Sequence, residues 1–114
     1  WEINKLILIF QPHVYSRTKM FYKEFANILS KADMVFLTDI YPSREKPIDG
    51  VNSKLISDNM DLDKTFLLSK EEIVKKVSKT TNEGDMIIIM GAGDITDITN
   101  LVYKQIEMKV SDEA

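Results

Sequence analysis

The chain has 114 residues and a net charge of −3; 44% of its residues are apolar and 29% are charged. This length suits one domain with a buried core, and the negative charge argues against nucleic acid as the main partner. The chain has no cysteine, which excludes a disulfide framework and a thiolate zinc site and is typical of a cytoplasmic protein. No apolar run approaches the length of a membrane-spanning helix, so no membrane partner is expected.

The chain begins with Trp1 rather than methionine, and the first expected strand, Leu6–Phe10, starts only a few residues later. This strand is a continuous apolar run, which is typical of strands buried on both faces of a parallel sheet. Because a strand so close to the first residue is an abrupt start, we expect residues 1–114 to be a single domain of a larger protein.

A helix is expected next, over Arg17–Lys31, with Ser16 as its N-cap. Its apolar residues recur at the spacing of one helix face. They are Phe21, Phe25, Ile28, Leu29 and Ala32. A second apolar strand, Met34–Thr38, follows. The segment Ile40–Gly50 then predicts an ordered loop, because it contains two prolines and a glycine.

The next segment, Asn52–Met60, is a weaker helix candidate with Leu55 and Ile56 facing inward. The third strand is expected at Thr65–Leu68. After it, Ser69 is expected to cap a helix over Lys70–Lys79, with Glu71 and Glu72 well placed in its first turn.

The fourth strand is expected at Met86–Met90, the most apolar run of the chain. Asp94 is expected to cap the last helix, Ile95–Val110. The apolar residues of that helix form one stripe, which consists of Ile95, Ile98, Val102 and Ile106.

Strands that alternate with helices predict right-handed βαβ crossovers and a three-layer α/β sandwich with a mostly parallel sheet. In such sheets ligands bind beyond the carboxyl ends of the strands. The loops that follow the strands are therefore candidate sites. They are Gln11–Ser16, Asp39–Gly50, Ser69–Lys70 and Gly91–Asp94.

The first of these loops contains cations where a helix start disfavours them. Arg17 and Lys19 fall in the first turn of the expected helix, and His13, the only histidine, lies just before it. With the free N–H groups of the helix start, these side chains predict an anion site in which Arg17 grips a carboxylate or phosphate. The alternative is a solvated basic turn.

The other loops offer further substrate-binding candidates. Asp39, at the end of a strand, can bind a ribose hydroxyl or an ammonium group, or it can cap a turn. Gly91 and Gly93 let the backbone approach a ligand closely, or they form a tight turn into the last helix. They do not complete the dinucleotide fingerprint, because Thr96 stands where a third small residue is needed.

Several other chemistries lack their residues. The chain has no G-x-x-x-x-G-K-[ST] loop to hold a triphosphate and no G-x-S-x-G motif for a nucleophilic serine. With one histidine and no cysteine, no metal site is expected.

Three motifs occur in order along the chain: F-Q-P-H-x-Y-S-R-T, D-I-Y-P-x-x-E-x-P-I-x-G and G-D-x-I-I-x-M-G-A-G-D-I. Over about Leu6 to Ile106 the sequence resembles the C-terminal domain of the Mur ligase family, in the branch that joins L-alanine to UDP-N-acetylmuramate. The resemblance implies a Rossmann-like domain that closes over the active site of a three-domain bacterial enzyme. It also implies ATP-dependent amide bond formation through an acyl phosphate, in peptidoglycan precursor synthesis.

In that family the histidine and arginine of the first motif are catalytic and substrate-binding, near L-alanine and the reacting phosphate. The resemblance carries these roles to His13 and Arg17. It also implies that ATP and Mg²⁺ are bound mainly by the N-terminal and central domains of the same enzyme, which this chain lacks. No cofactor is therefore expected on this piece alone, and the piece alone is expected to be inactive.

The sequence departs from the family at Val14, where some relatives have a second arginine. This leaves more of the anion binding to Arg17, with Lys19 as a weak substitute. Two alternatives remain open. One is a stand-alone doubly wound module that binds a nucleotide or an anion, and the other is a structural interaction domain.

Overall fold

The computed structural model describes residues 3–60, 63–91 and 93–113. Its four strands form one sheet in the order β3-β2-β1-β4, and every neighbouring pair is parallel. The strands are β1 (Leu6–Phe10), β2 (Met34–Leu37), β3 (Thr65–Leu67) and β4 (Met86–Met90). The expected parallel sheet is confirmed, and β2 and β3 each end one residue earlier than the sequence predicts.

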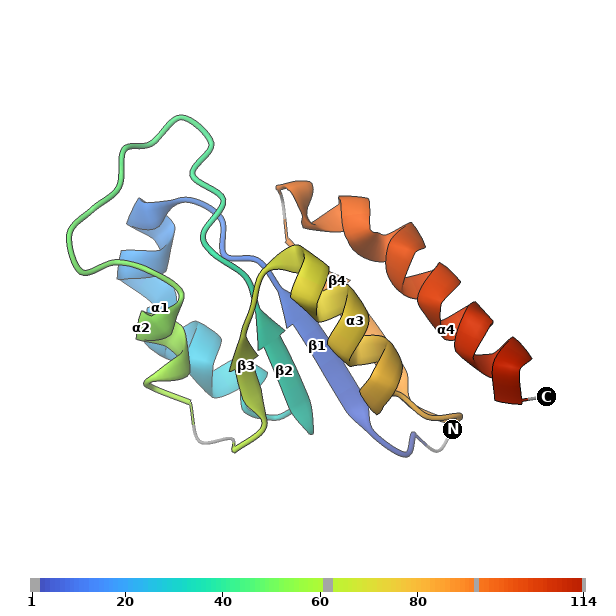
Figure 1. The fold of residues 1–114 in the computed structure, drawn as a ribbon. Coiled ribbons are helices and arrows are strands. Elements are labelled where there is room, and N and C mark those ends of the chain that lie inside the picture. Colours follow the sequence, from blue (N-terminus) through green and yellow to red (C-terminus); the bar gives the residue numbers. More distant parts are fainter. Residues whose placement is uncertain (1–2, 61–62, 92, 114) are drawn as a thin grey trace.

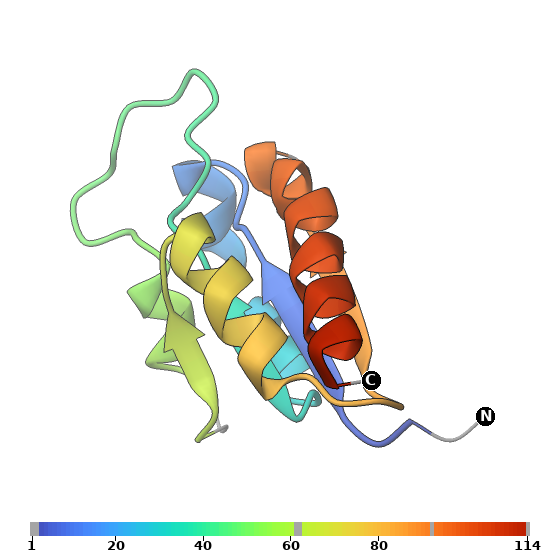
Figure 2. The same ribbon diagram turned by 45° about the vertical axis from the view of Figure 1, so that its right-hand side comes forward.

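Helices cover both faces of the sheet, as Figures 1 and 2 show from two directions. The helices α1 (Tyr15–Leu29) and α2 (Lys54–Ser57) pack on one face. The other face carries α3 (Lys70–Thr80), the short 3₁₀ helix η1 (Asp94–Ile98) and α4 (Thr99–Glu113). This arrangement confirms the three-layer α/β sandwich.

The strand β1 explains why the apolar runs are continuous. Successive side chains of a strand point to opposite faces. Ile7 and Ile9 are fully buried against α3, η1 and α4, whereas Leu8 is buried in the second core with α1 and α2. Because both faces are covered, no position within β1 favours a polar side chain.

The start of α3 is as predicted. The hydroxyl of Ser69 accepts a hydrogen bond from the N–H of Glu72, and the Glu72 carboxylate accepts one from the N–H of Ser69. This reciprocal pair is a capping box. Its donors and acceptors lie three residues apart, so the sequence alone contains everything that the helix start needs.

The start of α1 differs from the prediction. The helix begins at Tyr15, so Ser16 lies inside its first turn and is not the N-cap. Val14 takes the N-cap position without a side-chain hydrogen bond, at a φ of 57°. A positive φ is rare for a β-branched residue and costs on the order of 1–3 kcal/mol.

The buried face of α1 also differs from the expected stripe. Thr18, Ala26 and Leu29 are buried, whereas Phe21 and Ile28 are 39% and 58% exposed. The two exposed residues lie beside the face of α1 that packs on the sheet. Helical spacing alone did not distinguish these residues from the buried ones.

Two helix starts later in the chain were also placed wrongly. The weak helix is only Lys54–Ser57, although Ile56 is fully buried and Leu55 half-buried as expected. Asp94 is not an N-cap: it is the first residue of η1, and its carboxylate binds side chains of other loops. The expected helix over Ile95–Val110 is divided, because α4 begins only at Thr99. Its predicted apolar stripe is nevertheless buried at Ile95, Ile98 and Val102 and partly buried at Ile106.

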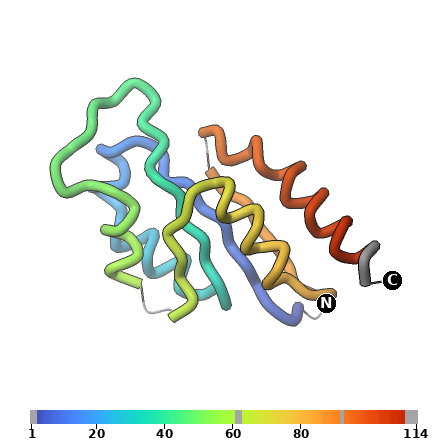
Figure 3. Tube along the Cα trace, viewed as in Figure 1, coloured from blue at the N-terminus to red at the C-terminus, as the bar shows by residue number. Residues whose placement is uncertain are grey.

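The carboxyl ends of the strands and the starts of α1, α3 and η1 gather at one edge of the sheet, at the top of Figure 1. The trace in Figure 3 shows the long loop after β2 arching over the start of α1. All four candidate loops therefore lie at the carboxyl edge.

Candidate functional site

A cleft of about 260 Å³ lies at the carboxyl edge of the sheet. Each of the four candidate loops contributes to its wall, which confirms that they come together. The lining residues are Gln11, Thr38, Asp39, Ile40, Tyr41, Pro42, Ser69, Lys70, Glu71 and Asp94. The candidate Asp39 thus lies in the cleft, with its side chain exposed.

Gln11 connects the end of β1 to the start of η1. The residue is buried, its Nε2 donates to Asp94 Oδ1 at 2.7 Å, and its Oε1 accepts from the N–H of Ile95 at 3.1 Å. A buried amide with both ends paired fixes the relative position of two segments 84 residues apart in sequence. Gln11 belongs to the predicted candidate loop Gln11–Ser16, but no role was predicted for it, although a polar residue directly after a buried strand was a usable signal.

Asp94 is also bound by Lys70, the first residue of α3. Lys70 Nζ lies 2.6 Å from Asp94 Oδ2. The hydrogen bond from Lys70, followed by the one from Gln11, lowers the pKa of the Asp94 carboxyl, and the same pair raises the pKa of Lys70. Both side chains keep substantial contact with water, so the ion pair contributes little stability by itself. Lys70 belongs to the predicted candidate loop Ser69–Lys70, but no role was predicted for its side chain.

His13 is held by Tyr41, which is the fourth residue after β2. The two residues form a parallel β-bridge. Their rings stack with centroids 6.0 Å apart and an interplanar angle of 16°. The Nδ1 atom of His13 is buried, and among the described residues it has no hydrogen-bond partner.

The backbone around His13 is fixed by the same tyrosine. The N–H of Tyr41 donates to the carbonyl of Pro12 at 2.9 Å, and the N–H of Val14 donates to the carbonyl of Tyr41 at 2.8 Å. The Val14 carbonyl in turn accepts from the hydroxyl of Thr18 at 2.9 Å. These bonds on both sides account for the positive φ of Val14, because strained backbone persists where its surroundings over-determine it.

Arg17 and Lys19 lie on the exposed surface of α1, two residues apart, and neither is among the described residues that line the cleft. Within the described part of the chain, no ion pair engages the Arg17 guanidinium. The structure therefore brings His13 against a cleft-lining residue and leaves Arg17 and Lys19 open to solvent. Their roles in binding stay predictions.

The start of α1 already holds a carboxylate. Glu45 accepts a hydrogen bond from the N–H of Ser16 at 2.9 Å and another, very short one, from the Ser16 hydroxyl. The Ser16 hydroxyl, and then its N–H, lower the pKa of Glu45. One of the N–H groups that the sequence analysis assigned to an anionic ligand is thus bound by the chain itself. Glu45 was missed because it is 29 residues away in sequence.

Gly91 and Gly93 lie close to side chains of the same chain. A Cβ at Gly91 would be 2.6 Å from Cγ2 of Ile95, and one at Gly93 would be 2.3 Å from Cγ of Tyr41 and 2.7 Å from Oε1 of Gln11. The close approach expected at these glycines is therefore made to the protein, and contact with a ligand stays a prediction.

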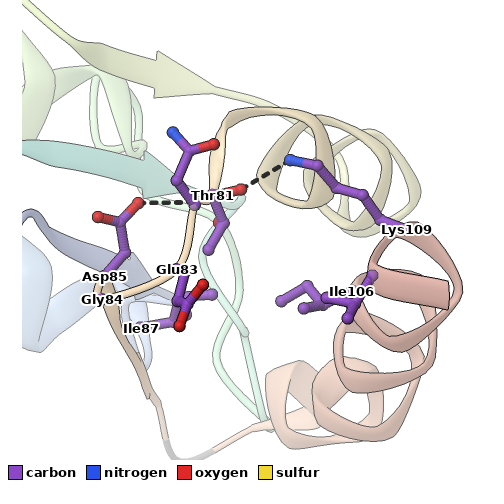
Figure 4. Close-up of a pocket in the computed structure, with 9 residues that line it drawn as sticks. Thr81, Glu83, Gly84, Asp85, Ile87, Ile106 and Lys109 are labelled. Atoms are coloured by element: carbon purple, nitrogen blue, oxygen red, sulfur yellow. Dashed lines mark hydrogen bonds between the residues drawn. The ribbon is translucent and has the colours of Figure 1, made fainter. Parts of the chain in front are cut away.

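A larger cavity of about 690 Å³ lies at the opposite, amino edge of the sheet, between the α3–β4 turn and α4 (Figure 4). Its floor includes Ile87 and Ile106, and Lys109 donates across it to the carbonyl of Thr81 at 2.7 Å. None of the candidate site residues lines this cavity, so it has no link to the predicted chemistry.

Two other kinds of site are absent from the part of the chain that the structure describes. No helix there is both long and apolar enough to cross a membrane. Among the described residues, no group of three or more histidine, aspartate or glutamate side chains is arranged to hold a metal ion.

Residues 1–93 match the protein family described as "Mur ligase, glutamate ligase domain". A UDP-N-acetylmuramate–L-alanine ligase of Phocaeicola vulgatus is 52% identical over 94 residues, which cover 81% of this chain and 20% of that protein. The ligase of the same name from Paenarthrobacter aurescens is 46% identical over 93 residues, or 82% of this chain and 20% of the relative. The ligase of the same name from Prochlorococcus marinus is 41% identical over 108 residues, which cover 90% of this chain and 22% of that protein. The chain spans about a fifth of the length of these curated relatives.

Proposed function

Because the chain belongs to the Mur ligase family, we propose that it is the C-terminal, amino-acid-binding domain of a three-domain ligase that joins L-alanine to UDP-N-acetylmuramate. The reaction is amide bond formation in the cytoplasm, as an early step of bacterial peptidoglycan synthesis. The observation that carries the proposal is the similarity, up to 52% identity, to ligases of that name over most of the chain.

The geometry supports this proposal at the carboxyl edge. The three motifs that carry the resemblance meet there: Gln11 and His13 from the first, Tyr41 from the second, and Gly93 and Asp94 from the third. A site assembled from three distant segments is what a domain that contributes one wall of an active site needs.

Arg17 is the residue that we propose for the carboxylate of L-alanine. Its guanidinium has the planar fork that grips a carboxylate with two parallel hydrogen bonds, and no ion pair within the described residues competes for it. His13 is proposed to contact the reacting phosphate end of the substrates, where added positive potential or an N–H donor stabilises developing negative charge.

ATP and Mg²⁺ do not fit the residues of this chain. The sequence has no P-loop, and the described residues include no cluster of carboxylates or histidine suited to a metal. In this proposal both are bound mainly by the remaining N-terminal and central domains of the ligase.

The test uses the full-length ligase that contains this domain. Arg17→Ala is expected to lower kcat/KM for L-alanine by an amount equivalent to roughly 2–4 kcal/mol, because a charged bidentate contact in a closed site is lost. L-Alanine-dependent phosphate release measures it. Lys31→Ala, an exposed cation just beyond the other end of α1, is the matched control and should behave as wild type. Unchanged alanine kinetics in Arg17→Ala would disprove the role of Arg17.

Calorimetry on the 114-residue chain tests the proposal against the stand-alone module. A wall of a larger site should bind ATP or L-alanine too weakly to measure. Binding of ATP at micromolar concentration by the chain alone would favour the nucleotide-binding module instead.

A further inference from the structure

We propose that Tyr41 is a positioning residue that sets the orientation of the His13 imidazole, and that Gly93 has no side chain because the Tyr41 ring occupies that space. This inference rests on the proposed function for the role of His13, but the geometry of the contact can be tested without it. Tyr41 lies in the predicted candidate loop Asp39–Gly50, but no role was predicted for its ring from the sequence.

The backbone of Tyr41 is bonded on both sides of His13. Tyr41 is bonded through its N–H to Pro12 and through its carbonyl to Val14, the two neighbours of His13. The bridge that pairs His13 with Tyr41 is isolated, since it lies beyond the ends of β1 and β2. The Cα of His13 is therefore held in register with Tyr41 at a point where the regular sheet has already ended.

The side-chain rings of His13 and Tyr41 are in contact as well. The rings of His13 and Tyr41 are nearly parallel, at 16°, and offset, with 6.0 Å between centroids. Offset stacking is a favoured arrangement of aromatic pairs. Since Nδ1 of His13 has no hydrogen-bond partner among the described residues, stacking on Tyr41 is the contact left to fix the rotation of the imidazole.

The Tyr41 ring is itself supported by Gly93. A Cβ on Gly93 would lie 2.3 Å from Cγ and 2.6 Å from Cδ2 of Tyr41, so the ring packs directly on the glycine backbone. Gln11, whose Oε1 would be 2.7 Å from the same Cβ, closes this contact from the side of β1. The ring of Tyr41 thus couples the glycine turn after β4 to the histidine turn after β1.

The burial of Nδ1 bears on which nitrogen of the His13 imidazole carries the proton. Nδ1 is the only buried side-chain nitrogen or oxygen without a partner in the described part of the chain, and no hydrogen bond to Nε2 is present there either. An N–H donor buried without an acceptor is the costlier state. The geometry therefore favours a proton on Nε2, the nitrogen left to face the solvent or a ligand.

Nuclear magnetic resonance can follow His13 directly, because it is the only histidine of the chain. In the untagged, isotope-labelled chain we expect nuclear Overhauser contacts between the imidazole and the Tyr41 ring, and imidazole proton signals displaced by the tyrosine ring current. Tyr41→Phe should keep both features and Tyr41→Leu should lose them. Gly93→Ala should shift the signals, because its methyl displaces the ring. Tyr103→Leu, an exposed tyrosine on α4, is the matched control.

The inference is overturned if the wild-type chain shows no contact between the two rings, or if the His13 signals are the same in Tyr41→Leu as in the wild type. The wild-type measurement needs no variant, so it decides the question even if Tyr41→Leu does not fold.

A double-mutant cycle in the full-length ligase then tests the link to catalysis. We expect Tyr41→Leu to lower kcat about tenfold in the wild-type background and less than about twofold in His13→Ala, as contacting residues that act through one another do. Equal losses in both backgrounds would show that Tyr41 does not act through His13. If His13→Ala leaves kcat unchanged, the proposed role of His13 fails, whereas the ring contact is judged by the resonance experiment alone.

Discussion

The two edges of the sheet use their polar side chains differently. At the amino edge, two lysines bond to backbone carbonyls, Lys5 to Thr80 at 2.8 Å and Lys109 to Thr81 at 2.7 Å. Lys5 also forms an ion pair there with Asp85 Oδ2, at 3.4 Å. At the carboxyl edge, side chains bond or stack on one another across loops, as in Gln11 with Asp94 and His13 with Tyr41.

Cavity volume and the contacts between motifs point to different edges of the sheet. The cavity at the amino edge is the larger, about 690 Å³ against about 260 Å³, yet its polar groups mainly close turns. The smaller cleft at the carboxyl edge contains the contacts between motifs. The meeting of the three motifs, rather than volume, therefore makes the carboxyl edge the candidate for the functional edge.

The largest expected effect comes from filling the space beside Tyr41. Gly93→Ala places a methyl 2.3 Å from the ring, and overpacking of this kind typically costs about 1–3 kcal/mol. Gly50→Ala is the control: its Cβ meets no atom within 4 Å, and only its φ of +78° is unfavourable, at a cost of about 1 kcal/mol. Urea unfolding of both variants measures the difference. Equal stabilities would mean that the ring does not pack against Gly93.

An effect no larger than this is expected when the hydrogen bonds of Gln11 between β1 and η1 are removed. Gln11→Leu leaves the N–H of Ile95 without its acceptor and takes one donor from Asp94. Loss of a buried paired amide should lower the free energy of unfolding by about 1–3 kcal/mol. Asn4→Ala at the amino edge removes an exposed bond to the carbonyl of Glu83 and should cost less than about 0.5 kcal/mol. Comparable losses would contradict the contrast between the edges.

The smallest effect concerns the ion pair of Lys70 and Asp94. The pKa of Asp94 is lower in the folded chain than when unfolded, so the stability from this pair is present above the unfolded pKa. It is lost as pH falls through the lowered folded value. Lys70→Met should therefore be slightly less stable than wild type at neutral pH, by less than about 1 kcal/mol, and the difference should shrink in acid.

Thermal unfolding of both proteins between pH 7 and about pH 3 checks this prediction, since that range spans the ordinary aspartate titration. A difference in stability that stays constant over the range would show that Asp94 gains nothing from Lys70. Added salt should reduce the effect at neutral pH, because the pair is partly solvated.

The sequence predicted best where the causes are local. The strands follow from short, mainly apolar runs, and the capping box of Ser69 and Glu72 follows from a spacing of three residues. It failed at the starts of α1 and η1. Ser16 and Asp94 have the right chemistry for N-caps, but Glu45 and the pair of Gln11 and Lys70 bind them instead.

The candidate site shows the same division. The motifs and the βαβ order were enough to place a cleft beyond the carboxyl ends of the strands and to select His13, Arg17 and Asp39 as candidates. Only the tertiary structure decided which side chains meet. It put Tyr41 against His13 and Gly93, and it left both His13 and Arg17 outside the set of residues that line the cleft. The physical reason is distance along the chain: periodicity and caps act over a few residues, whereas Gln11 and Ile95 are 84 residues apart and meet only because the parallel sheet brings their strands' ends together.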